Sequence, residues 1–147
     1  MRASTLLVSL WMAACLAACA PTVYARGTPQ PFDSACDGPN EGQQIAVDGY
    51  LRLPPSLDRA DRVVLGLYRD RTYAGRPIGV MMRFGDGPNQ AHKIASSYRD
   101  QDLRVHVVDG REVAFGTRLR VSGRVSFPAR PADYDCLLMD PYVEEAR

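Results

Sequence analysis

The sequence predicts a single, mainly β domain. Two observations support this prediction: apolar and polar residues alternate with a period of two in several segments, and turns rich in glycine or proline separate those segments. The 147 residues are also about the length of one domain. The alternation is clearest over 117–127, whereas a helical period occurs in only one short segment of the domain.

Three strands are predicted in the first half of the domain, over 43–53, 63–69 and 77–84. The first has one apolar and one polar face, which is typical of a half-buried strand. Gly49 in its middle predicts a bend or a close backbone approach, and Pro54-Pro55 ends it.

The segment 89–98 changes period and predicts a short amphipathic helix that Asn89 would cap. Four of its residues have helical spacing: Ala91, Ile94, Ala95 and Tyr98. Asp109-Gly110 then predicts the turn of a hairpin over 102–115. Strands over 117–127 and from Cys136 onward complete the domain, and Asp140-Pro141 predicts a bulge or an edge in the last strand.

This order of elements resembles the oligonucleotide/oligosaccharide-binding (OB) fold, a small Greek-key barrel of five strands. The resemblance covers 43–143, and the segment 116–125 is similar to the fourth strand of small bacterial OB-fold domains. It implies a barrel with one short helix between the third and fourth strands, although the hairpin over 102–115 is extra. A β-sandwich or a lipocalin-like barrel is the alternative.

The N-terminus carries an export signal. A positive charge at Arg2 precedes a short apolar core that is too short to span a bilayer. Leu16-Ala17-Ala18-Cys19 resembles the bacterial lipobox. The resemblance implies cleavage of the signal peptide 1–18, a diacylglyceryl group on Cys19 and a further acyl chain such as palmitate on the new amine. An ordinary secretory signal with a chance cysteine is the alternative.

The lipobox also implies an address. Ala20 stands where an Asp would retain an enteric lipoprotein at the inner membrane, so the resemblance favours the outer membrane, with the protein facing the periplasm. Residues 19–35 are rich in proline and predict a lipidated flexible tether, whose reach is on the order of 20 Å. Residues 36–147 are then the single β-barrel-like domain.

The cysteines have separate predicted fates. Cys15 leaves with the signal peptide and Cys19 takes the lipid, so Cys36 and Cys136 remain at the two ends of the domain. Because the periplasm is oxidising, we expect these two to form a disulfide bond; two free buried thiols are the alternative.

Charge and motifs narrow the function. Basic and acidic residues number 18 and 17, whereas a nucleic-acid-binding domain usually has a basic excess, so a nucleic-acid partner is disfavoured. The sequence has no nucleophile elbow, zinc-protease motif or phosphate loop, and we predict that it is not an enzyme.

No cofactor or metal site is predicted. His92 and His106 are the only histidines, and neither has a zinc-type spacing partner. The pairs Asp100/Asp102 and Asp133/Asp135 suit Ca²⁺ in type, but Asp is common in polar turns for its own backbone bonds.

One candidate binding surface is the arginine face, defined by the outward side chains Arg118, Arg120 and Arg124 of one strand. Arg104 on a neighbouring strand could extend it, and Tyr50 could add stacking if its strand adjoins. Such a face suits an anionic partner, which could be a glycan, a lipid head group or an acidic protein loop. A solvated outer sheet face is the alternative.

Taken together, the sequence predicts an envelope-anchored lipoprotein that acts as a non-enzymatic binding or interaction module in the periplasm. Its membrane contact is the lipid, and its other partner is an envelope protein, a glycan or an anionic ligand. Two alternatives stay open: an inhibitor or immunity-type lipoprotein that blocks a periplasmic toxin or lysozyme, and a cell-wall enzyme that uses a carboxylate pair.

Overall fold

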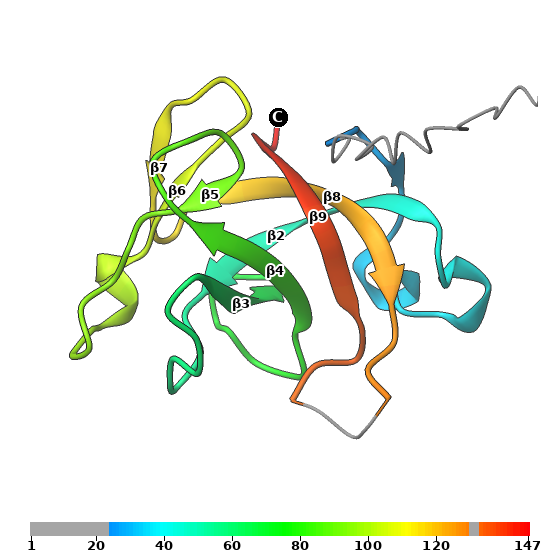
Figure 1. Cartoon of the computed structure of the whole chain (residues 1–147). Coiled ribbons are helices and arrows are strands. Elements are labelled where there is room, and N and C mark those ends of the chain that lie inside the picture. The colour runs from blue at the N-terminus through cyan, green and yellow to red at the C-terminus, as the bar shows by residue number, and fades with distance from the viewer. Residues whose placement is uncertain (1–23, 130–132) are drawn as a thin grey trace, which may run out of the picture.

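The computed structural model describes residues 24–129 and 133–147 (Figure 1). The predicted signal peptide, the predicted lipidation site Cys19 and residues 20–23 lie outside the described residues. Within the described part of the chain, no helix is long and apolar enough to cross a membrane.

Five strands close into a small barrel of the OB type, as the sequence predicts (Figure 1). They are β2 (Gln44–Arg52), β3 (Arg62–Tyr68), β4 (Ile78–Phe84), β8 (Arg118–Ser126) and β9 (Leu137–Glu145). The first three form a meander, β9 runs parallel to β4, and β8 lies between β9 and β2 to complete the ring. The structure therefore confirms the predicted five-stranded barrel and excludes the β-sandwich and the lipocalin-like barrel.

Alternating side chains fill the interior of the barrel. The inward residues of β8 and β2 are almost fully buried, while the arginines and Asp48 point outward. Burial of apolar surface, at about 25 cal/mol per Å², is the main force that closes such a ring. The largest buried side chains are Ile45, Leu65, Leu67, Ile78, Met82, Leu103 and Leu138.

Gly49 lets β2 serve two neighbours. β2 pairs with β8 over Gln44–Tyr50 and with β3 from Tyr50 to Arg52. A Cβ on Gly49 would collide with the carbonyl oxygen of Tyr68, so the bend predicted here depends on the close approach that only glycine allows. The predicted irregularity at Asp140 is also present: its φ is 51°, and the register of β8 and β9 shifts beside it.

An insert joins β4 to β8. It consists of β5 (Gln90–Ala91), a 3-10 turn η3 (Asp100–Asp102), β6 (Arg104–His106) and β7 (Glu112–Ala114). β6 and β7 form the predicted hairpin, with Gly110 at a φ of 84° in its turn.

The helix predicted over 89–98 is absent, and this prediction is wrong. Asn89 has a φ of 59° and cannot begin a helix there, and the next two residues pair with β4 and β6 as β5. Tyr98 turns away to donate a hydrogen bond to the carbonyl of Pro54, 2.7 Å away. Ala91, Ile94 and Tyr98 pack against the core whereas Ala95 is exposed, and such tertiary contacts override a local period. The described helical segments are three single 3-10 turns: η1 (Phe32–Ser34), η2 (Gly38–Asn40) and η3.

The flexible tether predicted over 19–35 also needs correction from residue 25 onward. β1 (Thr28–Pro29) pairs in parallel with β2, and Gln44 donates a side-chain hydrogen bond to the carbonyl of Ala25. Phe32 packs against the core. Prolines occur in edge strands and turns as well as in flexible linkers. The proline content therefore did not distinguish a segment packed on the barrel from a flexible tether.

The predicted disulfide between Cys36 and Cys136 is present, with a Cα–Cα distance of 5.5 Å. It links the segment between η1 and η2 to the residue just before β9 and closes a loop with a sequence separation of 100.

Candidate functional site

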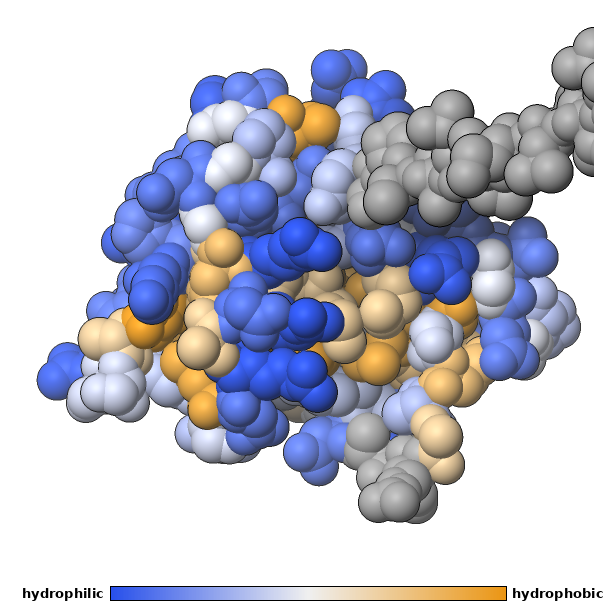
Figure 2. Space-filling model, in the orientation of Figure 1, coloured by the Kyte–Doolittle hydropathy of each residue, from blue (hydrophilic) through white to orange (hydrophobic). Residues whose placement is uncertain are grey.

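A groove of about 320 Å³ opens on the outer face of β3 and β4, between the loop 53–61 and residues 133–134. We call it the β3–β4 groove. It has an apolar floor and a charged rim, and apolar patches lie between charged ones on the face that carries β4 and β9 (Figure 2). Its principal residues are Pro54, Pro55, Leu57, Asp58, Arg59, Arg62, Val64, Met81, Asp133 and Tyr134.

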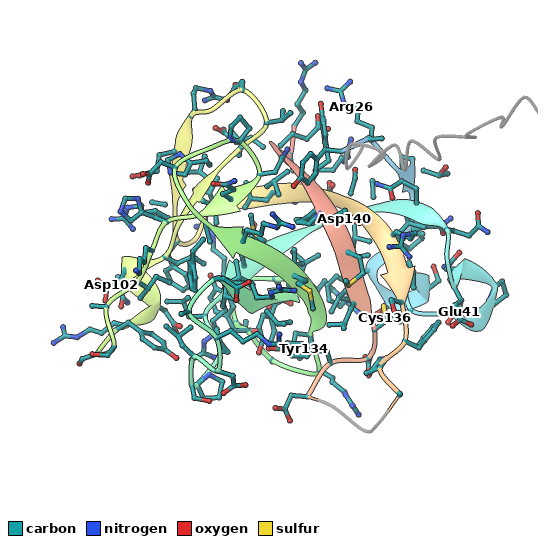
Figure 3. All side chains as sticks on the ribbon, viewed as in Figure 1. Arg26, Glu41, Asp102, Tyr134, Cys136 and Asp140 are labelled. Carbon is teal, nitrogen blue, oxygen red and sulfur yellow. A yellow bond between two sulfur atoms is a disulfide. The ribbon has the colours of Figure 1, made fainter. Side chains whose placement is uncertain are left out.

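Tyr134 fixes one wall of the β3–β4 groove (Figure 3). Its hydroxyl donates a hydrogen bond to the carbonyl oxygen of Val64 on β3, 3.0 Å away. Its ring lies against β4 at Gly79, where a Cβ would come within 3.0 Å of the ring. Burial raises the pKa of the Tyr134 hydroxyl, so it remains a neutral donor at physiological pH.

The opposite wall is the loop that begins at Pro54-Pro55. The carbonyl of Pro54 accepts the hydrogen bond from Tyr98 of the insert, which ties the start of this loop to the insert. Leu57 turns inward and packs against the core. Both walls are thus held in place by hydrogen bonds, one to β3 and one to the insert, as a preformed binding site requires.

The rim of the β3–β4 groove is electrically balanced. It carries two carboxylates, Asp58 and Asp133, and two guanidinium groups, Arg59 and Arg62. Arg62 also pairs with Asp61 at 2.9 Å, and its hydrogen bond lowers the pKa of that carboxyl. The rim therefore offers hydrogen-bond donors and acceptors around an apolar floor without a net charge.

Carboxylates neutralise much of the arginine face. Asp48, directly across from Arg120 on β2, accepts hydrogen bonds from its Nε at 2.7 Å and from its Nη2 at 3.2 Å. The same carboxylate lies 3.4 Å from Arg118, and Asp140 lies 3.6 Å from Arg124. The hydrogen bond that Arg120 donates to Asp48 raises the pKa of Arg120 above its usual range.

Of the two residues predicted to extend the arginine face, Tyr50 lies beside it and Arg104 does not. Tyr50 is the cross-strand partner of Arg118, so its strand does adjoin, and the guanidinium of Arg71 stacks over its ring at 5.5 Å from the centroid. Arg104 lies on β6, which pairs with β5 and β7 rather than with β8. Its guanidinium donates to the carbonyls of Gln101 and Leu103, so the prediction that it extends the arginine face is wrong.

Three of the four aspartates considered for Ca²⁺ form ion pairs or hydrogen bonds within the protein. Asp100 pairs with Arg52 at 2.9 Å, and Asp102 accepts the backbone N–H of Arg99 at 2.7 Å. Asp135 lies 3.0 Å from Arg76.

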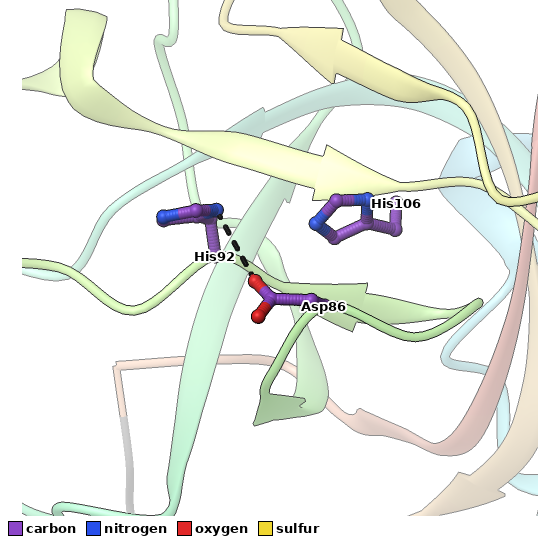
Figure 4. Close-up of side chains that lie close together, drawn as sticks. All are labelled: Asp86, His92 and His106. Carbon is purple, nitrogen blue, oxygen red and sulfur yellow. Dashed lines mark ion pairs between the residues drawn. The ribbon is translucent and has the colours of Figure 1, made fainter.

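The histidines differ from the expectation based on spacing. Asp86, His92 and His106 form one group whose potential ligand atoms all lie within 4.8 Å of one another (Figure 4). No local sequence pattern indicates this group, because its members come from three segments and have no helical spacing. We call it the Asp–His cluster.

The β3–β4 groove was likewise missed from the sequence. Pro54-Pro55 marked only the end of a strand, and no local pattern connects the loop 53–61 to Tyr134.

In comparisons with protein families, curated proteins and solved structures, nothing matched the chain.

Proposed function

We propose that this chain is a lipid-anchored envelope protein whose barrel binds a ligand, without catalysis, in the β3–β4 groove. The observation that carries the proposal is the position of this groove. OB barrels bind oligonucleotides and oligosaccharides on the face of their second and third strands, between the loops after the first and fourth strands. In this barrel, β3 and β4 are those strands, and the loop 53–61 and residues 133–134 are parts of those loops.

The chemistry of the β3–β4 groove favours a neutral, extended ligand such as a glycan strand. Sugar rings present apolar C–H faces and polar edges, which fit the apolar side chains of Pro55, Leu57 and Tyr134 in the two walls and the mixed charges of the rim. A nucleic acid would instead need an excess of cationic groups, and the described residues of the rim show no such excess.

Two further features support binding rather than the alternatives. Asp58 and Asp133, the rim carboxylates, are exposed, whereas acid catalysis by a carboxyl group favours a buried, water-excluded position. The binding surface is concave, whereas an inhibitor that blocks an enzyme cleft needs a projecting segment.

Calorimetry with chitotetraose, a neutral oligomer of N-acetylglucosamine, tests the proposal on the full chain in detergent. Asp58→Ala with Arg59→Ala removes two exposed hydrogen-bonding groups from the rim. The loss of two hydrogen bonds, at about 0.5–1.5 kcal/mol each, predicts an affinity that is weaker by about 5- to 150-fold. The matched control is Arg118→Gln with Arg124→Gln, which changes two exposed charges on the arginine face and should leave the affinity unchanged.

An anionic probe separates the β3–β4 groove from the arginine face. If the arginine face is the binding surface, a heparin fragment should bind, Arg118→Gln with Arg120→Gln and Arg124→Gln should weaken it, and salt should weaken it further because exposed charges are screened. Failure of chitotetraose to bind, or binding that the rim variant leaves intact, would refute the glycan assignment.

A further inference from the structure

The Asp–His cluster lies where the insert leaves the barrel. Asp86 is in the loop after β4, His92 follows β5, and His106 ends β6. Their side chains come together from three separate segments (Figure 4). This site is distinct from both the β3–β4 groove and the arginine face.

The backbone holds these three segments together. The N–H of Gly85 donates to the carbonyl of Ala91, and the N–H of Asn89 donates to the carbonyl of His106, at 2.9 and 2.8 Å. The N–H of His92 donates to the carbonyl of Arg104 at 2.9 Å. Because each bonded residue is a member of the cluster or lies within three positions of one, these bonds hold the three segments in a fixed arrangement.

His106 carries the second, independent observation. The residue is partly buried, yet both of its ring nitrogens are inaccessible to solvent, and neither has a hydrogen-bond partner among the described residues. Buried polar atoms are almost always satisfied, so such a ring needs an explanation. His92 Nδ1 lies 3.6 Å from Asp86 Oδ1, but neither residue forms a hydrogen bond with a ring nitrogen of His106.

We propose that the Asp–His cluster binds a divalent transition-metal ion of the Zn²⁺ class. Two imidazoles and one carboxylate are a donor set that Zn²⁺ uses, often with a fourth position open to water, whereas Ca²⁺ and Mg²⁺ prefer oxygen ligands alone. Zinc–ligand distances of about 2.0–2.1 Å place the ligand atoms about 3.3 Å apart in a tetrahedron. The 3.6 Å between His92 Nδ1 and Asp86 Oδ1 is close to that separation.

The remaining separation can close by side-chain rotation. The side chain of His92 is 50% exposed and that of Asp86 is 85% exposed, so both can turn toward the ring of His106, and an ion can enter between them. Glu112 Oε2 lies 3.8 Å from His92 Nδ1 and provides a further oxygen at the edge of the site. A bound ion would join the loop after β4 to the hairpin and so stabilise the insert.

Calorimetric titration with ZnCl₂ tests the site, with the full chain in detergent and without a polyhistidine tag. CoCl₂ is the second probe, because tetrahedral Co²⁺ with nitrogen ligands has strong visible absorption bands. We expect one bound ion per chain, and CaCl₂ and MgCl₂ should not compete. Asp86→Asn and His92→Gln, both at exposed positions, should weaken binding by about tenfold or more each.

The matched control is Asp37→Asn, since Asp37 is an exposed aspartate in another part of the chain beside η2. This variant should bind Zn²⁺ as the wild type does. Absence of Zn²⁺ binding and of a Co²⁺ spectrum in the wild type would overturn the proposal. Equal binding by Asp86→Asn, His92→Gln and the wild type would overturn it as well, because the ion would then sit elsewhere.

Discussion

Asn89 holds the junction between the barrel and its insert. It is 5% exposed, and its side-chain oxygen accepts the backbone N–H of Val143 on β9 at 2.8 Å. Its own N–H donates to the carbonyl of His106 on β6. Its φ of 59° lies in the left-handed region, which asparagine tolerates better than most residues. One side chain therefore satisfies a buried donor and allows the turn that starts the insert.

Replacing Asn89 with alanine should reduce the free energy of unfolding by about 2–5 kcal/mol. Loss of the acceptor leaves the N–H of Val143 buried without a partner, which costs about 1–3 kcal/mol, and the left-handed conformation costs alanine about 1–2 kcal/mol more. Urea unfolding followed by circular dichroism measures the change. Asn89→Gly is the control. Glycine adopts the left-handed conformation without strain but lacks the acceptor, so the stability of this variant should lie between those of the wild type and Asn89→Ala. If both variants stay within about 0.5 kcal/mol of the wild type, the role assigned to Asn89 is wrong.

At the scale of elements, β9 connects the parts of the molecule. It pairs with β4 on one side and β8 on the other, and its Val143 bonds to the insert through Asn89 and Val108. Glu144 near its end pairs with Arg26 of the N-terminal segment at 2.9 Å. Cys136 just before it carries the disulfide.

Removing the disulfide should destabilise the barrel without changing its fold. Cys136→Ala is expected to cost about 2–5 kcal/mol, the usual range for a native disulfide in a small secreted domain. The loop it closes is long, so the unfolded chain gains much freedom when the bridge is lost. Urea unfolding of the variant, compared with the double variant Cys36→Ala with Cys136→Ala, separates loss of the bridge from the effect of a free thiol at Cys36.

Thiol blocking checks the same bridge directly. Protein unfolded without reductant should leave Cys36 and Cys136 unreactive, and both should react after reduction. Two reactive thiols before reduction would show that the bridge does not form in the mature protein.

The sequence predicted elements well where burial follows the local period. Alternation located β2, β4 and β8 to within one residue at each end, and the apolar run over 63–69 located β3 equally well. The insert has no such uniform environment: Ala91 is buried in β5, whereas Ala95 is exposed in a loop. Its helical spacing therefore carried no information about its structure. The tether prediction failed for residues 25–35 for a related reason, since edge pairing of β1 leaves no apolar period to detect.

At the scale of the whole molecule, the candidate sites depend on topology. The β3–β4 groove exists because closure of the barrel brings Pro54 and Tyr134, which are distant in sequence, to one face. The Asp–His cluster exists because β5 and β6 pair beside the end of β4. The disulfide was predictable from the sequence because only two cysteines remain for it, whereas the groove and the cluster needed the three-dimensional arrangement.

The fold also changes how the barrel would be anchored. Since Ala25 already contacts the barrel, only the five residues 20–24 separate that contact from a lipid on Cys19. Fully extended, such a link spans at most about 17 Å. A lipidated protein would thus hold its barrel close to the membrane surface. The barrel could not move as far from the membrane as a flexible tether over 19–35 would permit.

The lipid anchor itself is the last prediction. Cys19→Ser should abolish incorporation of a palmitate analogue, because only a thiol accepts the diacylglyceryl group. Each buried methylene contributes about 0.8 kcal/mol to membrane binding, and stable attachment takes more than one chain, so the unlipidated protein should leave the membrane fraction. Cys15→Ser is the matched control and should label and fractionate as the wild type does. The barrel should still form its disulfide in the Cys19→Ser protein, since Cys36 and Cys136 are untouched, which shows that release reflects the missing lipid and not misfolding. Continued labelling and membrane retention of Cys19→Ser would mean that the anchor lies elsewhere.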